Sequence, residues 1–145
     1  MPKALIDGVE VYYESHGDGF PLVWCHEFAG DHRSWESQVR FFSRRYRVIT
    51  YNARGYPPSE VPTDPEAYSQ ERSVEDLKGL LDHLEIGSAH IGGLSMGGSV
   101  TLHFGIKYPR MARSLIVAGA GSGSVDPESF RRTTNALAER METEG

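Results

Sequence analysis

The sequence predicts an α/β domain with a mostly parallel, twisted sheet, helices on both faces and a β-hairpin at the amino terminus. Three observations support this fold class: an early Asp-Gly turn between strand-forming runs, later apolar runs without polar alternation, and amphipathic helical segments between those runs. With 145 residues, 39% of them hydrophobic, the chain is long enough to bury a core as one domain. In such sheets ligands bind beyond the carboxyl ends of the strands, so we expect the functional site there.

The amino-terminal hairpin is predicted over residues 4–13. Asp7-Gly8 is a strong two-residue turn signal, and β-branched and aromatic residues flank it. A second turn at residues 16–19 leads into residues 21–25, a short apolar run typical of a central strand that is buried on both faces. Cys25 at its end is interpreted as a packing residue, since buried thiols behave as small apolar groups.

Strands and helices alternate after this run. Asp31 is expected to cap a helix whose apolar stripe is Trp35, Val39 and Phe42. Residues 46–51 form the next predicted strand, and a loop rich in proline and glycine follows it.

The second helix is expected to open at Ser73 and to stop at Gly87. One of its faces carries Val74, Leu77, Leu81 and Leu84. Residues 88–92 then resemble a strand, and residues 95–108 a helix.

The helix over residues 95–108 is expected to turn Leu102 and Ile106 inward and to end before Pro109. Residues 115–118 read as another buried apolar strand.

The composition excludes several function classes. The formal net charge is −5, so we expect no nucleic-acid partner and no anionic membrane surface. A lone cysteine excludes an internal disulfide framework and a multi-cysteine zinc site, and we expect neither a metal nor a cofactor. The chain has no run of about 18 apolar residues and no apolar stretch typical of a secretory signal at its start, so we expect a cytoplasmic protein outside the membrane.

The residues Gly93-Leu94-Ser95-Met96-Gly97 fit the pattern G-x-S-x-G between a predicted strand and a predicted helix. In this pattern the serine sits on a sharp, strained turn that lifts its hydroxyl clear of the backbone, and a side chain at either glycine would collide with neighbouring elements. The backbone N–H of Met96, at the start of the helix, then points where an oxyanion would form. Ser95 is therefore the candidate nucleophile. A short match can also be a turn that binds phosphate or only packs, an alternative that the strand-to-helix context disfavours.

Three segments carry a resemblance to the α/β-hydrolase family. Residues 23–30 resemble the family's strand-ending His-Gly-x-x-Gly loop, residues 51–59 resemble its Asp-x-Arg-Gly-x-Gly-x-Ser loop, and residues 93–98 resemble its nucleophile elbow. The resemblance covers residues 1–120 and identifies the chain as the amino-terminal half of such a hydrolase. It is similar to small-molecule members such as enol-lactonases, esterases and carbon–carbon bond hydrolases.

The sequence departs from the family's pattern at three positions. Glu27, Asn52 and Pro57 stand where the family carries glycine, aspartate and glycine. The resemblance implies that the second oxyanion N–H comes from Phe28. A Glu27 carboxylate facing the oxyanion would repel the developing charge, so we expect this side chain to point away into polar surroundings. The other two changes concern a supporting loop.

A serine nucleophile needs a histidine base and an acid that orients it. None of the six histidines is a convincing base: His26 is interpreted as structural, His32 as solvated although it could line a pocket, and His103 lies about 12 Å along the helix from Ser95. The resemblance implies that both partners follow later strands. We expect them from a companion polypeptide, most simply the carboxyl-terminal portion of one precursor, which would also cover the strand at residues 115–118.

Residues 125–145 form a second predicted segment after a core that covers residues 1–124. Asp126-Pro127 is typical of a helix start. One face of this helix carries Phe130, Thr134, Leu137 and Met141. In the family that the chain resembles, a lid over the active site begins here. The small-residue stretch at residues 119–124 is interpreted as its hinge, since it lacks the Gly-Lys-Ser/Thr ending of a phosphate-binding loop.

Together these observations predict a serine hydrolase that acts on a small ester, lactone or similar carbonyl compound through an acyl-enzyme. Ser95 is the nucleophile, the Phe28 and Met96 amides hold the oxyanion, and Gly93 and Gly97 shape the elbow. The alternative is a truncated, non-catalytic hydrolase-like binding module, which the missing base favours if no other chain supplies one. A dehalogenase or epoxide hydrolase with an aspartate nucleophile is disfavoured because Ser95 occupies that position.

Overall fold

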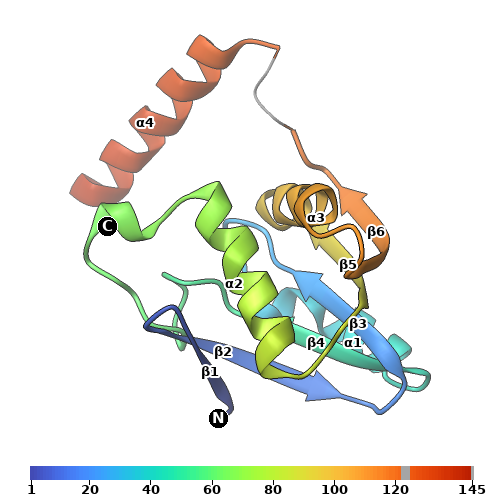
Figure 1. Cartoon of the computed structure of the whole chain (residues 1–145). Helices are drawn as coiled ribbons and strands as arrows, with labels where there is room; N and C mark the ends of the chain where they lie inside the picture. Colours follow the sequence, from blue (N-terminus) through green and yellow to red (C-terminus); the bar gives the residue numbers. More distant parts are fainter. Residues whose placement is uncertain (122–124, 145) are drawn as a thin grey trace.

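The computed structural model describes residues 1–121 and 125–144, and the last part of the predicted hinge at residues 119–124 lies outside them (Figure 1). Its strands are β1 (Lys3–Ile6), β2 (Val9–His16), β3 (Phe20–Cys25), β4 (Tyr46–Tyr51), β5 (Ala89–Leu94) and β6 (Ala112–Ala118). Its α-helices are α1 (Glu36–Phe42), α2 (Gln70–His83), α3 (Met96–Lys107) and α4 (Pro127–Glu144), with short 3-10 turns η1 (His32–Trp35) and η2 (Pro65–Ala67).

The strands form one mixed sheet in the order β1-β2-β4-β3-β5-β6. β1 and β2 make the predicted hairpin, and β2 pairs antiparallel with β4. Strands β3, β4, β5 and β6 are parallel to one another, and Val23 of β3 lies opposite both Ile49 of β4 and Ile91 of β5. This arrangement confirms the predicted fold class, and it brings the carboxyl ends of β3, β4, β5 and β6 to one edge.

Both faces of the sheet are covered, because successive side chains of β3 point to opposite sides. Leu22 and Trp24 join Trp35 and Val48 on the α1 face, where the two tryptophan rings stack with their centroids 4.5 Å apart. The other face holds the larger cluster under α2 and α3, which includes Val23, Ile49, Leu77, Leu80, Ile91 and Phe104. Helices therefore lie on both faces, as the sequence predicts.

The boundaries of α2 differ from the prediction. The helix begins one turn earlier than Ser73, since the Ser69 hydroxyl accepts a hydrogen bond from the Arg72 N–H at 3.0 Å and caps it. At the other end Glu85, not Gly87, takes the left-handed conformation, with φ at 56°. The predicted core face of α2 is otherwise correct.

The orientation of α3 also differs from the prediction. Leu102 and Ile106 point outward and are 43% and 70% exposed, so the expectation that they face inward is wrong. The helix instead buries Gly97, Gly98, Val100, Thr101 and Phe104. Small residues at its first turn let α3 approach the sheet closely, and this approach sets which face is inside.

β6 and α4 make up the outer parts of the described chain. β6 is an edge strand with Leu115, Ile116 and Val117 38–45% exposed, so residues 115–118 form a strand that is not buried within the described chain, in agreement with the expectation that only a companion polypeptide would cover it. α4 begins as predicted, with an Asp126 carboxylate oxygen accepting from the Ser129 N–H at 2.9 Å, and none of its residues is buried. Figure 1 shows α4 apart from both faces of the sheet. Within the described ranges, no helix is long and apolar enough to cross a membrane.

Candidate active site

Ser95 joins β5 to α3 in a strained backbone conformation. Its φ is 52° and its ψ is −113°, a region that costs a non-glycine residue about 1–3 kcal/mol. The Ser95 N–H donates to the Ala118 carbonyl of β6 at 2.9 Å, and the Ser95 carbonyl accepts from the Ser99 N–H at 3.0 Å. The side chain is exposed, and its hydroxyl has no hydrogen bond to any described residue. The predicted strained turn is thus confirmed.

The two glycines that flank Ser95 have no room for a side chain. A Cβ on Gly93 would lie 2.2 Å from the Gly97 carbonyl oxygen, and a Cβ on Gly97 would lie 2.1 Å from the Cys25 carbonyl oxygen. In both cases the obstacle is backbone, which cannot swing aside. The steric reason that the sequence pattern suggests is therefore the one found in the structure.

Ser95 opens on a groove of about 690 Å³ that also contacts Phe28, Met96 and residues of α4. A second lobe of about 930 Å³ shares Phe28 and Met96 with the first and extends toward Tyr56 and Tyr68. The three residues to which the sequence assigns nucleophile and oxyanion roles are thus brought to one groove. No histidine is among the described residues that line either lobe.

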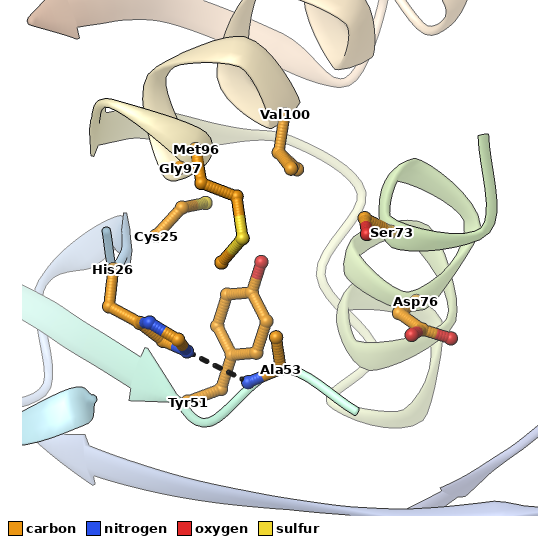
Figure 2. Close-up of a pocket in the computed structure, with 9 residues that line it drawn as sticks. All are labelled: Cys25, His26, Tyr51, Ala53, Ser73, Asp76, Met96, Gly97 and Val100. Carbon is orange, nitrogen blue, oxygen red and sulfur yellow. Dashed lines mark hydrogen bonds between the residues drawn. The ribbon is translucent and has the colours of Figure 1, made fainter. Parts of the chain in front are cut away.

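On the side away from the groove, where the elbow faces the ends of β3 and β4, side chains fill the space almost completely. Figure 2 shows the Met96 side chain reaching from the elbow toward Tyr51, above the buried residues at the ends of β3 and β4. The gap between them has a volume of about 10 Å³, which is no more than a single water molecule needs. This side supports the elbow and has no space for a substrate.

His26 holds two loops together beneath the elbow. The buried ring accepts a hydrogen bond from the Ala53 N–H at its Nε2 (3.0 Å, Figure 2) and donates from Nδ1 to the Glu27 carbonyl (2.8 Å). Burial lowers the pKa of the imidazole, so the ring is neutral in this arrangement. With both nitrogens engaged, His26 has a structural position, in agreement with its interpretation from the sequence.

Glu27, which replaces a glycine of the family pattern, lies against Ser34. Its Oε1 accepts from the Ser34 hydroxyl at 2.8 Å, and a Cβ on Gly30 would lie 1.9 Å from the same oxygen. Glu27 does not line either lobe of the groove that contains Ser95. The side chain therefore points away from the groove, as expected, but its surroundings are polar only at Oε1, because Oε2 is buried and has no hydrogen-bond partner among the described residues.

Asn52 and His32 are linked at the end of β4. The Asn52 side-chain oxygen accepts from both the His32 backbone N–H (2.9 Å) and the ring Nδ1 (2.7 Å), while its amide nitrogen donates to the Pro57 carbonyl (2.7 Å). The His32 side chain is only 15% exposed, so its expected solvated position is wrong. The amide of Asn52 thus ties the loop after β3 to the loop after β4.

A buried ion pair that sequence reasoning missed lies beside these loops. Arg54 Nε and Nη2 donate to the two carboxylate oxygens of Asp76, each at 2.6 Å, and Nη1 donates to the Ala67 carbonyl at 3.0 Å. Both side chains are buried. The available signal was Asp76 itself, an acidic residue between the core positions Val74 and Leu77 of α2.

Two further expectations concern cysteine and metals. Cys25 is buried, and desolvation raises the pKa of its thiol to about 11, which fits a packing role. Among residues 1–121 and 125–144, no group of three or more histidine, cysteine, aspartate or glutamate side chains is placed to hold a metal ion.

Comparison with known proteins gives a consistent picture. The curated relatives include 3-oxoadipate enol-lactonase 1 of Acinetobacter baylyi, 33% identical over 124 residues, and epoxide hydrolase 4 of Mus musculus, 32% identical over 127 residues. Each match covers 86% of this chain, but only 44% of the lactonase and 35% of the epoxide hydrolase. The chain therefore spans less than half the length of these two relatives.

The solved structure of the enol-lactonase from Burkholderia xenovorans LB400 superimposes with a TM-score of 0.79 at 29% identity. This match covers 97% of the chain and 58% of the lactonase. The sequence model of the alpha/beta hydrolase fold family matches residues 21–143, which include the loop after β3, Ser95 and all of α3. By this match over most of its length, the chain belongs to the alpha/beta hydrolase fold family.

Proposed function

We propose that this chain carries the nucleophile of a hydrolase that cleaves a small ester, lactone or similar carbonyl compound through an acyl-enzyme. The observation that carries the proposal is that Ser95 combines a strained backbone conformation with an exposed side chain that lines a groove. Strain of this kind persists where the surrounding structure holds it, and it is common at catalytic positions. A relative named as an enol-lactonase supports a carbonyl substrate.

In the proposed reaction the Ser95 Oγ forms a bond to the substrate carbonyl carbon, and its proton passes to a histidine. The carbonyl oxygen takes up the displaced electron pair and accepts hydrogen bonds from the backbone N–H groups of Met96 and Phe28. The C–O bond to the leaving group then breaks, and the histidine returns the proton to the departing oxygen. Water attacks the acyl-Ser95 ester by the same steps and releases the acid.

We further propose that a companion polypeptide supplies the histidine and the acid. Two observations on the described residues support it: no histidine lines the groove, and β6 presents an open, apolar edge next to the elbow. A strand added along β6 would satisfy that edge and lie close to Ser95, whose N–H already bonds to β6. In the same proposal α4 is the first helix of a lid over the groove.

Epoxide hydrolase chemistry is the second candidate, because epoxide hydrolase 4 is among the relatives. An aspartate-nucleophile mechanism needs a carboxylate where this chain has the Ser95 hydroxyl. The hydroxyl suits acyl transfer, so carbonyl hydrolysis remains the proposal.

Labelling with a fluorophosphonate tests the nucleophile. In the protein isolated with any polypeptide that accompanies it, we expect the label on the peptide that contains Ser95, and we expect Ser95→Ala to lose it together with at least a thousandfold of 4-nitrophenyl ester hydrolysis. Ser88→Ala, at the opposite end of β5, is the matched control and should keep both. Failure to label Ser95 in the complete assembly would favour the non-catalytic binding module.

Native mass spectrometry tests the companion. We expect this 16.1-kDa chain in a larger assembly with a second, different polypeptide that carries a histidine within reach of Ser95. A monodisperse 16.1-kDa monomer with full esterase activity would contradict the proposal.

A further inference from the structure

We infer that the substrate of Ser95 is an uncharged carbonyl compound with apolar groups on both sides of the carbonyl. This inference rests on the proposed function and adds the chemical class of the substrate. It comes from the charge, shape and exposure of the two lobes on which the elbow opens. Five residues line both lobes: Phe28, Gln70, Met96, Thr134 and Met141.

The lobes have almost no charged groups among their described walls. α4 carries seven charged side chains, and none of them lines either lobe: Glu128, Arg131, Arg132, Glu139, Arg140, Glu142 and Glu144. The single charged side chain in the walls is Arg54, in the second lobe. Three of its five N–H groups bond to Asp76 and to the Ala67 carbonyl, its charge is paired with the Asp76 carboxylate, and its side chain is only 5% exposed, so it is poorly placed to bind a substrate carboxylate.

Apart from Arg54, the polar side chains among the described walls are uncharged, and the hydroxyls of Tyr68, Ser73 and Thr134 already donate to backbone carbonyls. The Thr134 hydroxyl donates to the Phe130 carbonyl at 2.8 Å, while Gln70 and Ser99 contribute an amide and a hydroxyl. A carboxylate moved from water into such walls would lose its hydration without gaining a cation. The described groove therefore selects against an anionic substrate.

The apolar walls favour the opposite kind of ligand. Phe28, Phe130, Leu137 and Met141 are each about half exposed, and all four face the first lobe. An apolar group placed there would remove their free surface from water at about 25 cal/mol per Å². The flexible thioethers of Met96 and Met141 can adapt to apolar groups of different shapes.

The shape places the carbonyl between two apolar portions. Each lobe, at about 690 and 930 Å³, is in the size range of small-molecule sites. Phe28 and Met96, whose N–H groups are the proposed oxyanion donors, line both lobes. A carbonyl held by these donors would direct its acyl portion into one lobe and its leaving group into the other.

A binding experiment tests this class without requiring catalysis. On the Ser95→Ala protein, isolated with any accompanying polypeptide, isothermal titration calorimetry compares phenyl hexanoate with monophenyl adipate, which has a carboxylate in place of the terminal methyl. We expect phenyl hexanoate to bind at least 30-fold more tightly. Equal affinities, a preference for the adipate ester, or no binding of either ester would overturn the inference. Failure of the proposed function is read separately, from the labelling of Ser95.

Two neighbouring threonines of α4 provide a matched pair that assigns the selectivity to the groove. Thr134 lines both lobes, whereas Thr133 lines neither, and each hydroxyl donates to the carbonyl four residues before it. In the Ser95→Ala background, Thr134→Lys should reduce the preference for phenyl hexanoate at least tenfold, because it adds a cation to the wall. Thr133→Lys adds the same charge outside the groove and should leave the preference unchanged. An equal shift in both variants, or none in Thr134→Lys, would contradict the assignment.

Discussion

The two sides of the elbow at Ser95 are built in opposite ways. Beneath it, the backbone of β3 approaches Gly97 so closely that a Cβ would lie 2.1 Å from a carbonyl oxygen, and the remaining gap is about 10 Å³. On its outer side, Ser95 opens on a groove of about 690 Å³ whose apolar walls are half exposed. Close backbone packing on one side therefore fixes the strained turn, while its other side is accessible to a ligand.

This difference explains how one short loop can be both rigid and accessible. An unfavourable backbone conformation persists only when its surroundings leave no alternative, and here the constraint comes from His26, Gly97 and the ends of β3 and β4. The outer side adds no constraint of that kind, since α4 has no buried residue. Substitutions on the packed side should therefore change the free energy of unfolding, whereas those on the open side should change ligand binding.

The largest expected effect is on the packed side, at Asp76, which borders the small gap under the elbow. Asp76→Ala leaves the buried Arg54 guanidinium without its carboxylate and should lower the free energy of unfolding by about 3–5 kcal/mol. Urea denaturation followed by circular dichroism measures this loss. The double variant Arg54→Met/Asp76→Leu removes both charges and should recover most of it. If the double variant is no more stable than Asp76→Ala, an unpaired charge is not the cause.

Gly97→Ala should have the next largest effect, because it places a methyl group against the Cys25 and His26 carbonyls. We expect a loss of about 1–3 kcal/mol in the free energy of unfolding, as for other overpacked sites. Gly87→Ala is the control, since a Cβ there meets no atom within 4 Å, and its effect should stay within about 0.5 kcal/mol. Equal losses in urea denaturation would mean that the contact beneath the elbow is not tight.

These tests concern features that the sequence reveals to different degrees. The hairpin and the elbow could be predicted because their causes are local: Asp7-Gly8 forms the turn, and Gly93 and Gly97 are required on either side of Ser95. The parallel strands could be predicted because each is a short, apolar run between turns.

Other features depend on tertiary structure and could not be predicted. Leu102 and Ile106 are apolar at helical spacing, yet α3 approaches the sheet through Gly97 and Thr101, so the larger residues face outward. The start of α2 was missed because Ser69 and Ser73 are both suitable caps, and only the hydrogen bond to Arg72 distinguishes them. The ion pair joins residues 22 positions apart: an acidic residue at a core position of α2 marks Asp76, but nothing in the sequence identifies Arg54 as its partner.

The packed side of the elbow should also make the free energy of unfolding depend on pH. Burial lowers the pKa of His26 below its ordinary value of 6.5, so on acidification the unfolded chain takes up this proton before the folded chain does. The free energy of unfolding should therefore keep its full value above pH 6.5. At lower pH it should decrease by up to about 1.4 kcal/mol per pH unit, until the pH reaches the lowered pKa of His26. Urea denaturation between about pH 5.5 and 7.5 measures this slope. His26→Gln should flatten it, whereas His103→Gln, on the exposed face of α3, should leave it unchanged. A slope that persists in His26→Gln would assign the proton to another group.

The smallest expected effect on stability is that of a substitution at Phe28, on the open side of the elbow, for which Phe104 in the core is the matched reference. Phe104 is fully buried under the sheet, while Phe28 is 52% exposed and lines both lobes of the groove. Phe104→Ala should cost about 3–5 kcal/mol in the free energy of unfolding, because it leaves a cavity in the core. Phe28→Ala removes the same atoms from a wall already in contact with water and should change stability by no more than about 0.5 kcal/mol. It should instead weaken binding of phenyl hexanoate to the Ser95→Ala protein, since an apolar wall is lost.

Calorimetry and urea denaturation on the same preparations separate the two effects. A loss of stability for Phe28→Ala close to that for Phe104→Ala would show that the outer wall belongs to the packed core and is not free to take up a ligand.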